Sequence, residues 1–362
     1  MRDIDRQLFD ATEKGDAALV RRLLDEGADV EARCDYRRKK IELDSDYPPE
    51  LKAEQLARDD LDDTALLLAA RLEHVNVVAA LLDAGADPNA SSGGPCIDET
   101  ALTLAAWRKC VPMLRLLLDK GAAINVADGW GDTPLICAAS TGDEESVRLL
   151  LERGADIHAT DEMGANVLLR AAGGGNIAVI TLLEELGLPL ESEDEIERTA
   201  VMHAATHGYA QALRFLVERG LPTNAVDEYG TTVLMHAASA LSGSSDAARF
   251  LVEECGADIH ARDELCGATA LMHAAASGNT EVLRFLLQLG ADANAADNNG
   301  DTPLIYARRI RGERNAECVR ILLEHGANPN TSNHKGKTLF SIATEDGNED
   351  ILAVLRAAGV EK

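Results

Sequence analysis

The chain has 362 residues and a formal net charge of −27, because it carries 62 acidic side chains and only 35 Lys and Arg. Nucleic acids and anionic membrane surfaces are bound mainly through Lys and Arg, so this charge argues against both as principal ligands. Hydrophobic residues make up 46% of the chain but aromatic residues only 3%. The apolar mass is therefore largely Ala and Leu, which favours helices over a β-sandwich or barrel.

A short block of the Thr-Pro-Leu type recurs along the chain. In chain order it occupies residues 64–66, 100–102, 133–135, 166–168, 199–201, 232–234, 269–271, 302–304 and 338–340. A second block of the Gly-Ala-Asp type follows in step, at residues 27–29, 85–87, 121–122, 154–156, 256–258, 290–292 and 326–328. The first blocks start 33 residues apart between 133 and 232. A fixed period of this length indicates a repeat protein.

The unit at 133–154 shows what each repeat is expected to form. Apolar residues recur at three- and four-residue spacing in two successive segments, which predicts two short helices. Thr133 can cap the first helix, and Pro134 suits its first position, where a missing N–H has no consequence. Gly154 can end the second helix with a positive φ. Such a helix pair has too little apolar surface to be stable alone, so neighbouring units must stack.

These residues resemble the ankyrin repeat, whose pattern reads Thr-Pro-Leu-His-x-Ala-Ala, then Gly, a Leu-rich helix and Gly-Ala-Asp-x-Asn-Ala. Residues 132–139 and 290–295 are near matches. The resemblance implies an all-α solenoid of about ten helix-turn-helix units joined by β-hairpin-like loops, with residues 1–362 as a single domain. We expect an N-terminal capping repeat at about 3–32, an insertion at about 33–59, repeats at about 60–333 and a C-terminal capping repeat at about 334–362.

Partners of ankyrin-like proteins usually contact the hairpin tips and the first helices, which line a concave face. The tip position, three residues before each motif block, holds Ile97, Trp130, Met163, Ile196 and Tyr229 in successive units. The helix position, seven residues after the start of the block, holds Arg71 and Trp107 in two early units. Acidic residues surround the tips, and those expected to contact a partner are Glu99, Asp132, Glu162, Glu195 and Glu228.

Aromatic side chains surrounded by charges are typical of the centre of a protein interface. The apolar residues at the tip and helix positions, with the acidic residues around them, therefore predict binding of a basic or amphipathic segment of another protein. The alternative is that large residues at the tip position only pack one hairpin on the next.

Residues that suggest chemistry have simpler explanations. His203, His236 and His273 occupy the fifth motif position of three adjacent units, a ladder that could in principle bind a metal ion. The resemblance implies instead that this histidine hydrogen-bonds a neighbouring loop, and Cys137 and Tyr306 fill the same position elsewhere. The sequence contains no phosphate-binding glycine loop, zinc-protease motif or nucleophile elbow. We expect no enzyme activity, no cofactor and no metal.

The sequence thus predicts a non-enzymatic scaffold or adaptor for protein–protein interaction. One alternative is a dedicated inhibitor that occludes a partner enzyme with the insertion near residues 36–49, and another is an enzyme with an unrecognised site. The first residues lack a secretion signal, no apolar run reaches the roughly 18 residues of a membrane span, and the seven cysteines form no Cys-x-x-Cys pair. We therefore expect a cytoplasmic monomer with reduced thiols.

Overall fold

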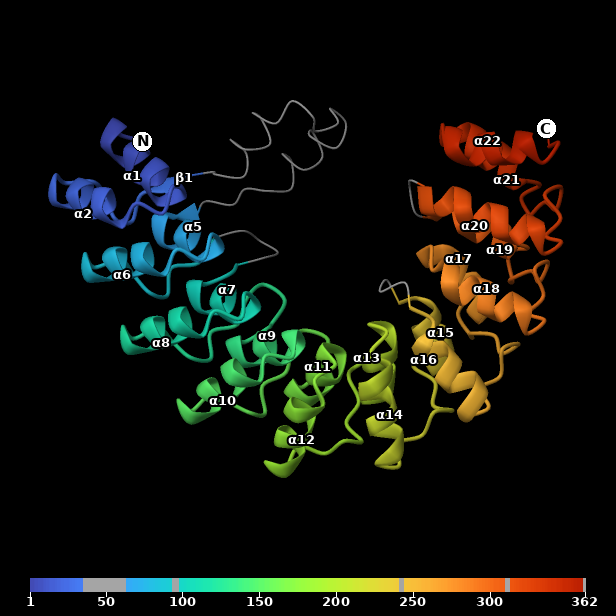
Figure 1. Cartoon of the computed structure of the whole chain (residues 1–362), viewed down its shortest axis with the longest axis horizontal. Helices are drawn as coiled ribbons and strands as arrows, with labels where there is room; N and C mark the ends of the chain where they lie inside the picture. Colours follow the sequence, from blue (N-terminus) through green and yellow to red (C-terminus); the bar gives the residue numbers. More distant parts are fainter. Residues whose placement is uncertain (35–62, 93–97, 241–243, 310–312, 361–362) are drawn as a thin grey trace. The chain divides into compact units, whose positions relative to one another are not determined.

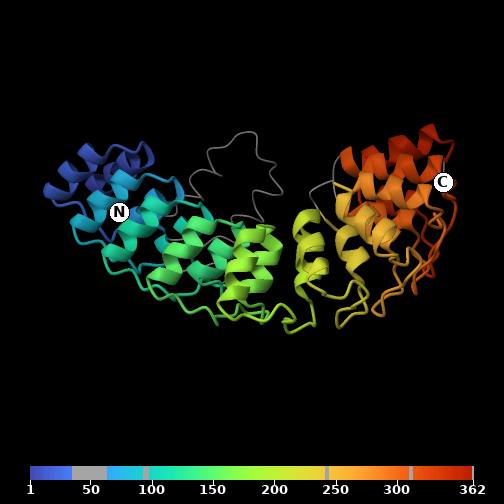
Figure 2. The same ribbon diagram turned by 60° about the horizontal axis from the view of Figure 1, so that its bottom comes forward.

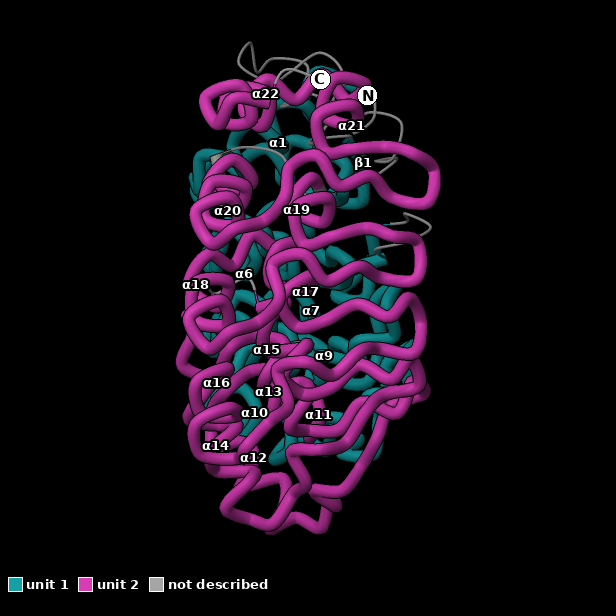
Figure 3. Tube along the Cα trace, turned by 90° about the vertical axis from the view of Figure 1, so that its right-hand side faces the viewer, with its two compact units in different colours: residues 1–167 teal, residues 168–362 magenta. Residues whose placement is uncertain are grey.

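The computed structural model describes residues 1–34, 63–92, 98–240, 244–309 and 313–360 (Figure 1). It divides into two compact units, residues 1–167 and 168–362, drawn in teal and magenta in Figure 3. Most of the predicted insertion at 33–59, with its basic run and Tyr36–Pro49, lies outside the described residues, as does Ile97. Each unit is described by itself below.

The described residues of unit 1 form four helix pairs. They are α1 (Asp3–Glu13) with α2 (Ala17–Asp25), α5 (Ala65–Arg71) with α6 (Val75–Asp83), α7 (Ala101–Trp107) with α8 (Val111–Asp119), and α9 (Pro134–Thr141) with α10 (Glu144–Glu152). Strand β1 (Arg33–Cys34) pairs antiparallel with β2 (Asp63–Thr64), and Arg33 lies opposite Thr64. The two ends of the insertion are therefore held side by side.

The described residues of unit 2 form six further pairs, two of which include a distorted helix. They are α11 (Val167–Gly174) with α12 (Ile177–Glu185), α13 (Ala200–Thr206) with α14 (Ala210–Glu218), α15 (Val233–Ala238) with α16 (Asp246–Arg249) and the π-helix η1 (Phe250–Glu254), α17 (Ala270–Ser277) with α18 (Thr280–Gln288), α19 (Pro303–Tyr306) and the 3₁₀-helix η2 (Ala307–Arg309) with α20 (Glu313–Glu324), and α21 (Leu339–Glu345) with α22 (Glu349–Ala357). The ten pairs confirm the predicted all-α repeat architecture.

Within each unit the helices form two layers. The first helices contact one another in series, as α1–α5–α7–α9 in unit 1 and α13–α15–α17–α19 in unit 2. The second helices form the other layer, as α2–α6–α8–α10 and α18–α20–α22. In each unit the loops that join successive pairs extend beyond one end of the helices (Figures 2 and 3). The loop tips are therefore the parts of each repeat farthest from the shared core.

The local signals in the sequence behave as expected. The hydroxyl of Thr133 accepts a hydrogen bond from the backbone N–H of Ile136 at 3.4 Å, and Pro134 is the first residue of α9. Gly154 has φ +88° after α10. The Cys137 and Cys318 side chains are buried in the core. Within the described residues, no helix has the length and apolarity to cross a membrane.

A ladder of Arg and Phe side chains connects the second helices of unit 2. The guanidinium of Arg214 lies 4.2 Å from the centre of the Phe250 ring, and that of Arg249 lies 4.4 Å from the centre of the Phe285 ring. Each arginine thus stacks on the phenylalanine one repeat further along the chain. Such cation–π contacts stabilise the layer. They explain why an Arg-Phe dipeptide recurs in three successive repeats, at residues 214–215, 249–250 and 284–285.

The loop tips are turns of the form Asp-x-x-Gly. In the tip at 227–230, Oδ1 of Asp227 accepts hydrogen bonds from the backbone N–H groups of Tyr229 at 3.0 Å and Thr231 at 2.8 Å. The glycine that ends the turn, Gly230, has φ +71°. The corresponding residue at 194–197 is Glu197, with φ +62°. A residue with a Cβ is disfavoured in this left-handed conformation, so the backbone is strained at Glu197.

Replacing Glu197 with glycine should relieve this strain. We expect Glu197→Gly to raise the free energy of unfolding by about 1 kcal/mol, because the relief exceeds the added entropy of the unfolded chain. Denaturant unfolding followed by circular dichroism would measure it. Glu195→Gly in the same turn serves as the control, since Glu195 lacks a positive φ, and it should not stabilise the protein. Equal effects of the two variants would contradict the explanation.

Candidate functional site

Three large apolar side chains of unit 1 are exposed on its tips and first helices. Trp130 lies on the tip between α8 and α9 and is 60% exposed, while Trp107, at the end of α7, and Met163, on the next tip, are each 42% exposed. The backbone N–H of Glu162 donates a hydrogen bond to the carbonyl of Trp130 at 3.0 Å, so the tips of Trp130 and Met163 are adjacent. We call Trp107, Trp130 and Met163 the tryptophan patch.

Negative charge is concentrated beside the tryptophan patch. Oδ1 of Asp128 accepts hydrogen bonds from the backbone of Trp130 at 2.9 Å and of Asp132 at 3.0 Å, which fixes the tip. Burial raises the pKa of the Asp128 carboxyl, and the nearby charges of Glu99 and Glu162 raise it further. Because carboxylates raise one another's pKa only at short range, the Trp130 tip lies in a locally acidic environment.

Arg71 has a structural role that the sequence did not reveal. Its side chain is only 11% exposed, and it forms ion pairs with Asp63 at 2.9 Å and with Glu99 at 2.6 Å. Burial opposes its charge, yet the two carboxylates raise the pKa of the guanidinium. Arg71 and Glu99 therefore connect two repeats. Asp132 is also buried, so these three expected contact residues lie largely inside the repeat stack.

The predicted contact residues of unit 2 lie on its first tips. Tyr229 is 39% exposed, Ile196 is half-buried, and Glu195 and Glu228 are exposed. The backbone N–H of Glu228 donates to the carbonyl of Ile196 at 3.0 Å, so these two tips are adjacent. Leu265 is 70% exposed and was not among the residues predicted to contact a partner. The signal that could have found it is the tip at 263–267, which has one residue more than the Asp-x-x-Gly pattern.

The three histidines hold the tips of unit 2 to its first helices. Their Nε2 atoms lie 3.2, 3.0 and 3.1 Å from an Oδ2 atom of the tip aspartate in the pairs His203–Asp194, His236–Asp227 and His273–Asp263. On the other side of the ring, Nδ1 of His236 lies 3.1 Å from the hydroxyl of Thr206, and that of His273 lies 3.3 Å from the hydroxyl of Ser239. Both hydroxyls occupy the helix position of the preceding repeat. These histidines have the hydrogen-bonding role that the ankyrin resemblance implies.

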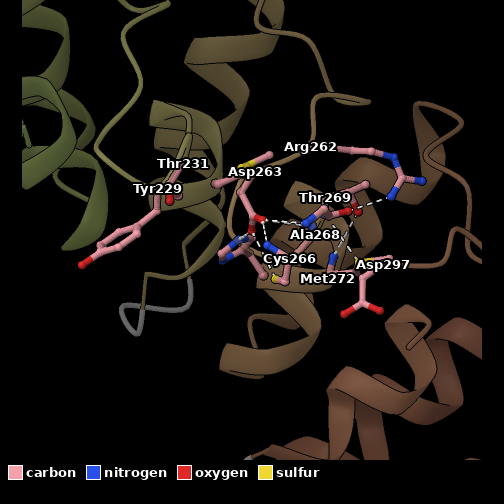
Figure 4. A network of polar contacts seen from close by, with 12 residues as sticks. Tyr229, Thr231, Arg262, Asp263, Cys266, Ala268, Thr269, Met272 and Asp297 are labelled. Atoms are coloured by element: carbon pink, nitrogen blue, oxygen red, sulfur yellow. Dashed lines mark hydrogen bonds and ion pairs between the residues drawn. The ribbon is translucent and has the colours of Figure 1, made fainter. Parts of the chain in front are cut away.

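Tyr306 replaces the histidine in one repeat. Its hydroxyl donates a hydrogen bond to Oδ2 of Asp297 at 2.9 Å, as the imidazoles do elsewhere. Burial and the neighbouring Cys266 and Asp297 raise the pKa of the Tyr306 hydroxyl, so it remains a neutral donor. Figure 4 shows the adjacent tip, where the Asp263 carboxylate accepts several hydrogen bonds and the Tyr229 ring points away from them.

The tip aspartates are strongly held in their charged form. Burial opposes ionisation of Asp227, but hydrogen bonds from His236 and from the Thr231 backbone lower the pKa of its carboxyl. The pKa values of the Asp194 and Asp263 carboxyls are lowered in the same way. Burial lowers the pKa of His203, and the charge of Arg198, which shares the Asp194 carboxylate, lowers it further. The His203 ring is therefore neutral near pH 7.

Taken with the repeated helix pairs, these tips define a helical repeat protein. The family model for ankyrin repeats, in its three-copy form, matches overlapping segments that together cover residues 8–362. The chain belongs to the ankyrin repeat family, which indicates a scaffold for protein–protein interaction.

Several curated proteins match short segments of the chain. Protein phosphatase 1 regulatory subunit 27 of Mus musculus is 45% identical over 65 residues, which is 18% of this chain and 41% of that protein. Putative ankyrin repeat protein L271 of Acanthamoeba polyphaga mimivirus is 39% identical over 72 residues, 20% of this chain and 10% of that protein. The 2-5A-dependent ribonuclease of Homo sapiens is 60% identical over 42 residues, 11% and 6% respectively. The chain spans less than half the length of each relative.

The tip aspartates make a prediction about acid stability. Because their pKa values in the folded state lie below the unfolded value of about 4, the stability that they contribute is present above that pH and is lost as the pH falls through the folded-state pKa. Asp227→Asn should lower the free energy of unfolding at pH 7 by about 1–3 kcal/mol and flatten its fall below pH 4. Urea unfolding at several pH values would measure this.

The matched control is Glu228→Gln, because Glu228 is the exposed neighbour of Asp227 in the same turn. This variant should keep both the stability and the acid dependence of the parent protein. If the two variants behaved alike, the hydrogen bonds of Asp227 would not be the cause.

Proposed function

We propose that the chain is a non-enzymatic adaptor that binds a basic or amphipathic segment of another protein through its tips and first helices. The tryptophan patch carries this proposal. Both tryptophans and Met163 are large apolar side chains that lie 42–60% exposed on the tips and first helices of unit 1. Covering such side chains on binding removes apolar surface from water, and tryptophan is the residue type most often found at the energetic centre of interfaces.

The surrounding charge indicates which segment suits the patch. Glu162 is exposed beside Trp130, and its charge, like that of Glu99, raises the pKa of the Asp128 carboxyl. A Lys or Arg of the partner would reduce the repulsion among these groups, whereas an acidic segment would increase it. In unit 2, Ile196 and Tyr229 with Glu195 and Glu228 repeat the same combination of apolar and acidic residues. We propose these four residues as contact residues of unit 2 in their own right, and we leave out Arg71, Glu99 and Asp132, which lie largely inside the repeat stack of unit 1.

A second candidate function is regulation of a partner enzyme, with the insertion as the inhibitory element. One observation favours it: a relative that matches 65 residues of this chain is named as a regulatory subunit of a protein phosphatase. Both functions require a protein partner, and in either case we propose a cytoplasmic protein that acts as a monomer. They differ in which part of the chain contacts the partner.

Removing both tryptophans should weaken binding without unfolding the protein. Peptides selected on the full-length chain from a random displayed library provide the probe. We expect the double variant Trp107→Ala, Trp130→Ala to bind them more weakly by at least about 2 kcal/mol, roughly thirtyfold, as measured by fluorescence anisotropy. Leu186→Ala, which also removes an exposed apolar side chain, should bind as the parent does. Unchanged affinity of the double variant, with its circular dichroism also unchanged, would contradict the proposal.

Deletion of the insertion distinguishes the two candidate functions. Because Cys34 and Asp63 are paired across β1 and β2, a two-residue Asn-Gly turn can join them after removal of residues 35–62. An adaptor that binds through the tryptophan patch should keep its affinity for the selected peptides within about twofold, and added salt should weaken the binding through the acidic tips. Loss of binding on deletion, with the tryptophan variants still active, would favour the inhibitor instead.

A further inference from the structure

Leu265 is the most exposed large apolar side chain of the described residues, at 70%. It lies in the tip at 263–267, between α16–η1 and α17. Counting back from Thr269 places Cys266 at the tip position, but Cys266 is half-buried. The side chain presented to solvent is therefore the one before it.

An additional residue in the turn explains why Leu265 protrudes. In the tip at 227–230, Oδ1 of Asp227 accepts hydrogen bonds from residues two and four positions later. In the longer tip, Oδ1 of Asp263 accepts them from Cys266 at 2.8 Å, Gly267 at 2.9 Å and Ala268 at 3.2 Å (Figure 4). Cys266 thus takes the anchored place and the residue before it is displaced outward.

Leu265 lies directly beside the tip of Tyr229. The carbonyl of Tyr229 accepts hydrogen bonds from the backbone N–H groups of Glu264 at 2.8 Å and Leu265 at 3.3 Å. The two tips approach so closely that a Cβ on Gly230 would lie 2.7 Å from the nitrogen of Glu264. Tyr229 and Leu265 are therefore an exposed apolar pair on adjoining, rigidly held turns, and we call them the Tyr–Leu pair.

The charges around the Tyr–Leu pair are acidic and available. Glu228 and Glu264 precede the two residues, and both are exposed. Arg262 is close in sequence, but its guanidinium donates to the carbonyls of Gly267 at 2.7 Å and Ala296 at 2.8 Å. Across the described part of the chain, no cation forms an ion pair with Glu228 or Glu264. A ligand that carries Lys or Arg can therefore pair with both carboxylates.

The acidic and apolar character ends at this pair. The next tips present Asn298 with Asn299, and then His334 with Lys335. Lys335 would repel a basic segment placed further along unit 2. Among the described tips of unit 2, the combination of acidic and apolar residues therefore extends from Ile196 to the Tyr–Leu pair, and the Tyr–Leu pair is its most exposed part.

We propose that Leu265 is the specificity-determining anchor of unit 2, and that it selects partner protein segments in which an apolar side chain is adjacent to Lys or Arg. The apolar side chain packs on the Tyr–Leu pair, and the cation pairs with Glu228 and Glu264. This inference rests on the proposed function, since it names the partner chemistry that this part of the surface recognises.

The test uses the full-length chain and peptides selected on it from a random displayed library. Affinities are compared among the parent, Leu265→Ser, the double variant Glu228→Gln, Glu264→Gln, and Leu289→Ser. Leu289 is the matched control, because it is an exposed leucine of the same unit that lies at the end of α18 and not on a tip. The selected set should contain peptides with an apolar residue beside Lys or Arg whose affinity falls about tenfold with Leu265→Ser. For those peptides the double glutamate variant should lower the affinity and reduce the effect of salt on it, and Leu289→Ser should leave the affinity unchanged.

The outcomes separate this inference from the proposed function. If the peptides lose affinity with the tryptophan variants but bind Leu265→Ser as they bind the parent, the proposed function stands and the role of Leu265 is wrong. If Leu265→Ser and Leu289→Ser weaken binding equally, the effect is not specific to the tip and the inference is again wrong. If the parent chain selects no peptide at all, both are contradicted.

Discussion

The hydrogen bonds that each tip aspartate accepts are the constraint on which the loops of this protein depend. One carboxylate oxygen accepts the backbone N–H groups of its own turn, in unit 1 at Asp128 and Asp161 and in unit 2 at Asp227. In unit 2 the second oxygen accepts a side chain of the following first helix, from a histidine or from Tyr306. A buried carboxylate without such partners would be unfavourable. The tip and the helix therefore form as one structure.

This arrangement also connects one repeat to the next. The imidazole of His236 contacts Asp227 in its own repeat with one nitrogen and Thr206 in the preceding repeat with the other. Within each unit, the backbone N–H of a tip donates to the carbonyl of the tip before it, as Glu162 does to Trp130 in unit 1 and Glu228 does to Ile196 in unit 2. The turn is thereby fixed on both sides. In the four-residue tip at 227–230, Glu228 and Tyr229 form the described hydrogen bonds through their backbone. Their side chains are free to vary, so a rigid frame presents a variable surface, which is what a recognition protein requires.

Much of the fold could be predicted from the sequence because its signals are local. The period, the capping threonine, the Pro at the first helical position and the Gly after the second helix each act within a few residues, and nothing distant overrides them. The positions of Trp107 and Trp130 followed from the same counting. The structural role of Arg71 did not follow from its position, because a long side chain can extend toward solvent or toward a carboxylate of a neighbouring repeat. Only the structure shows that Arg71 contacts Glu99 of the next repeat. The exposure of Leu265 did not follow either. The position three residues before Thr269 is Cys266, and the additional residue in this turn makes Leu265 the exposed side chain instead.

The net charge of −27 does not show which acidic groups a partner can contact. Asp63 is neutralised by Arg71, and Asp194, Asp227 and Asp263 are enclosed by hydrogen-bond donors inside the stack. These groups serve the fold, and because their side chains are buried a ligand cannot contact them directly. The acidic residues that we propose for partner contact are exposed and stand one position before the exposed apolar residue of a tip, as Glu162, Glu228 and Glu264 do. In the function we propose, recognition depends on a few carboxylates held at fixed places beside apolar side chains, because a general attraction between opposite charges would not distinguish one basic segment from another.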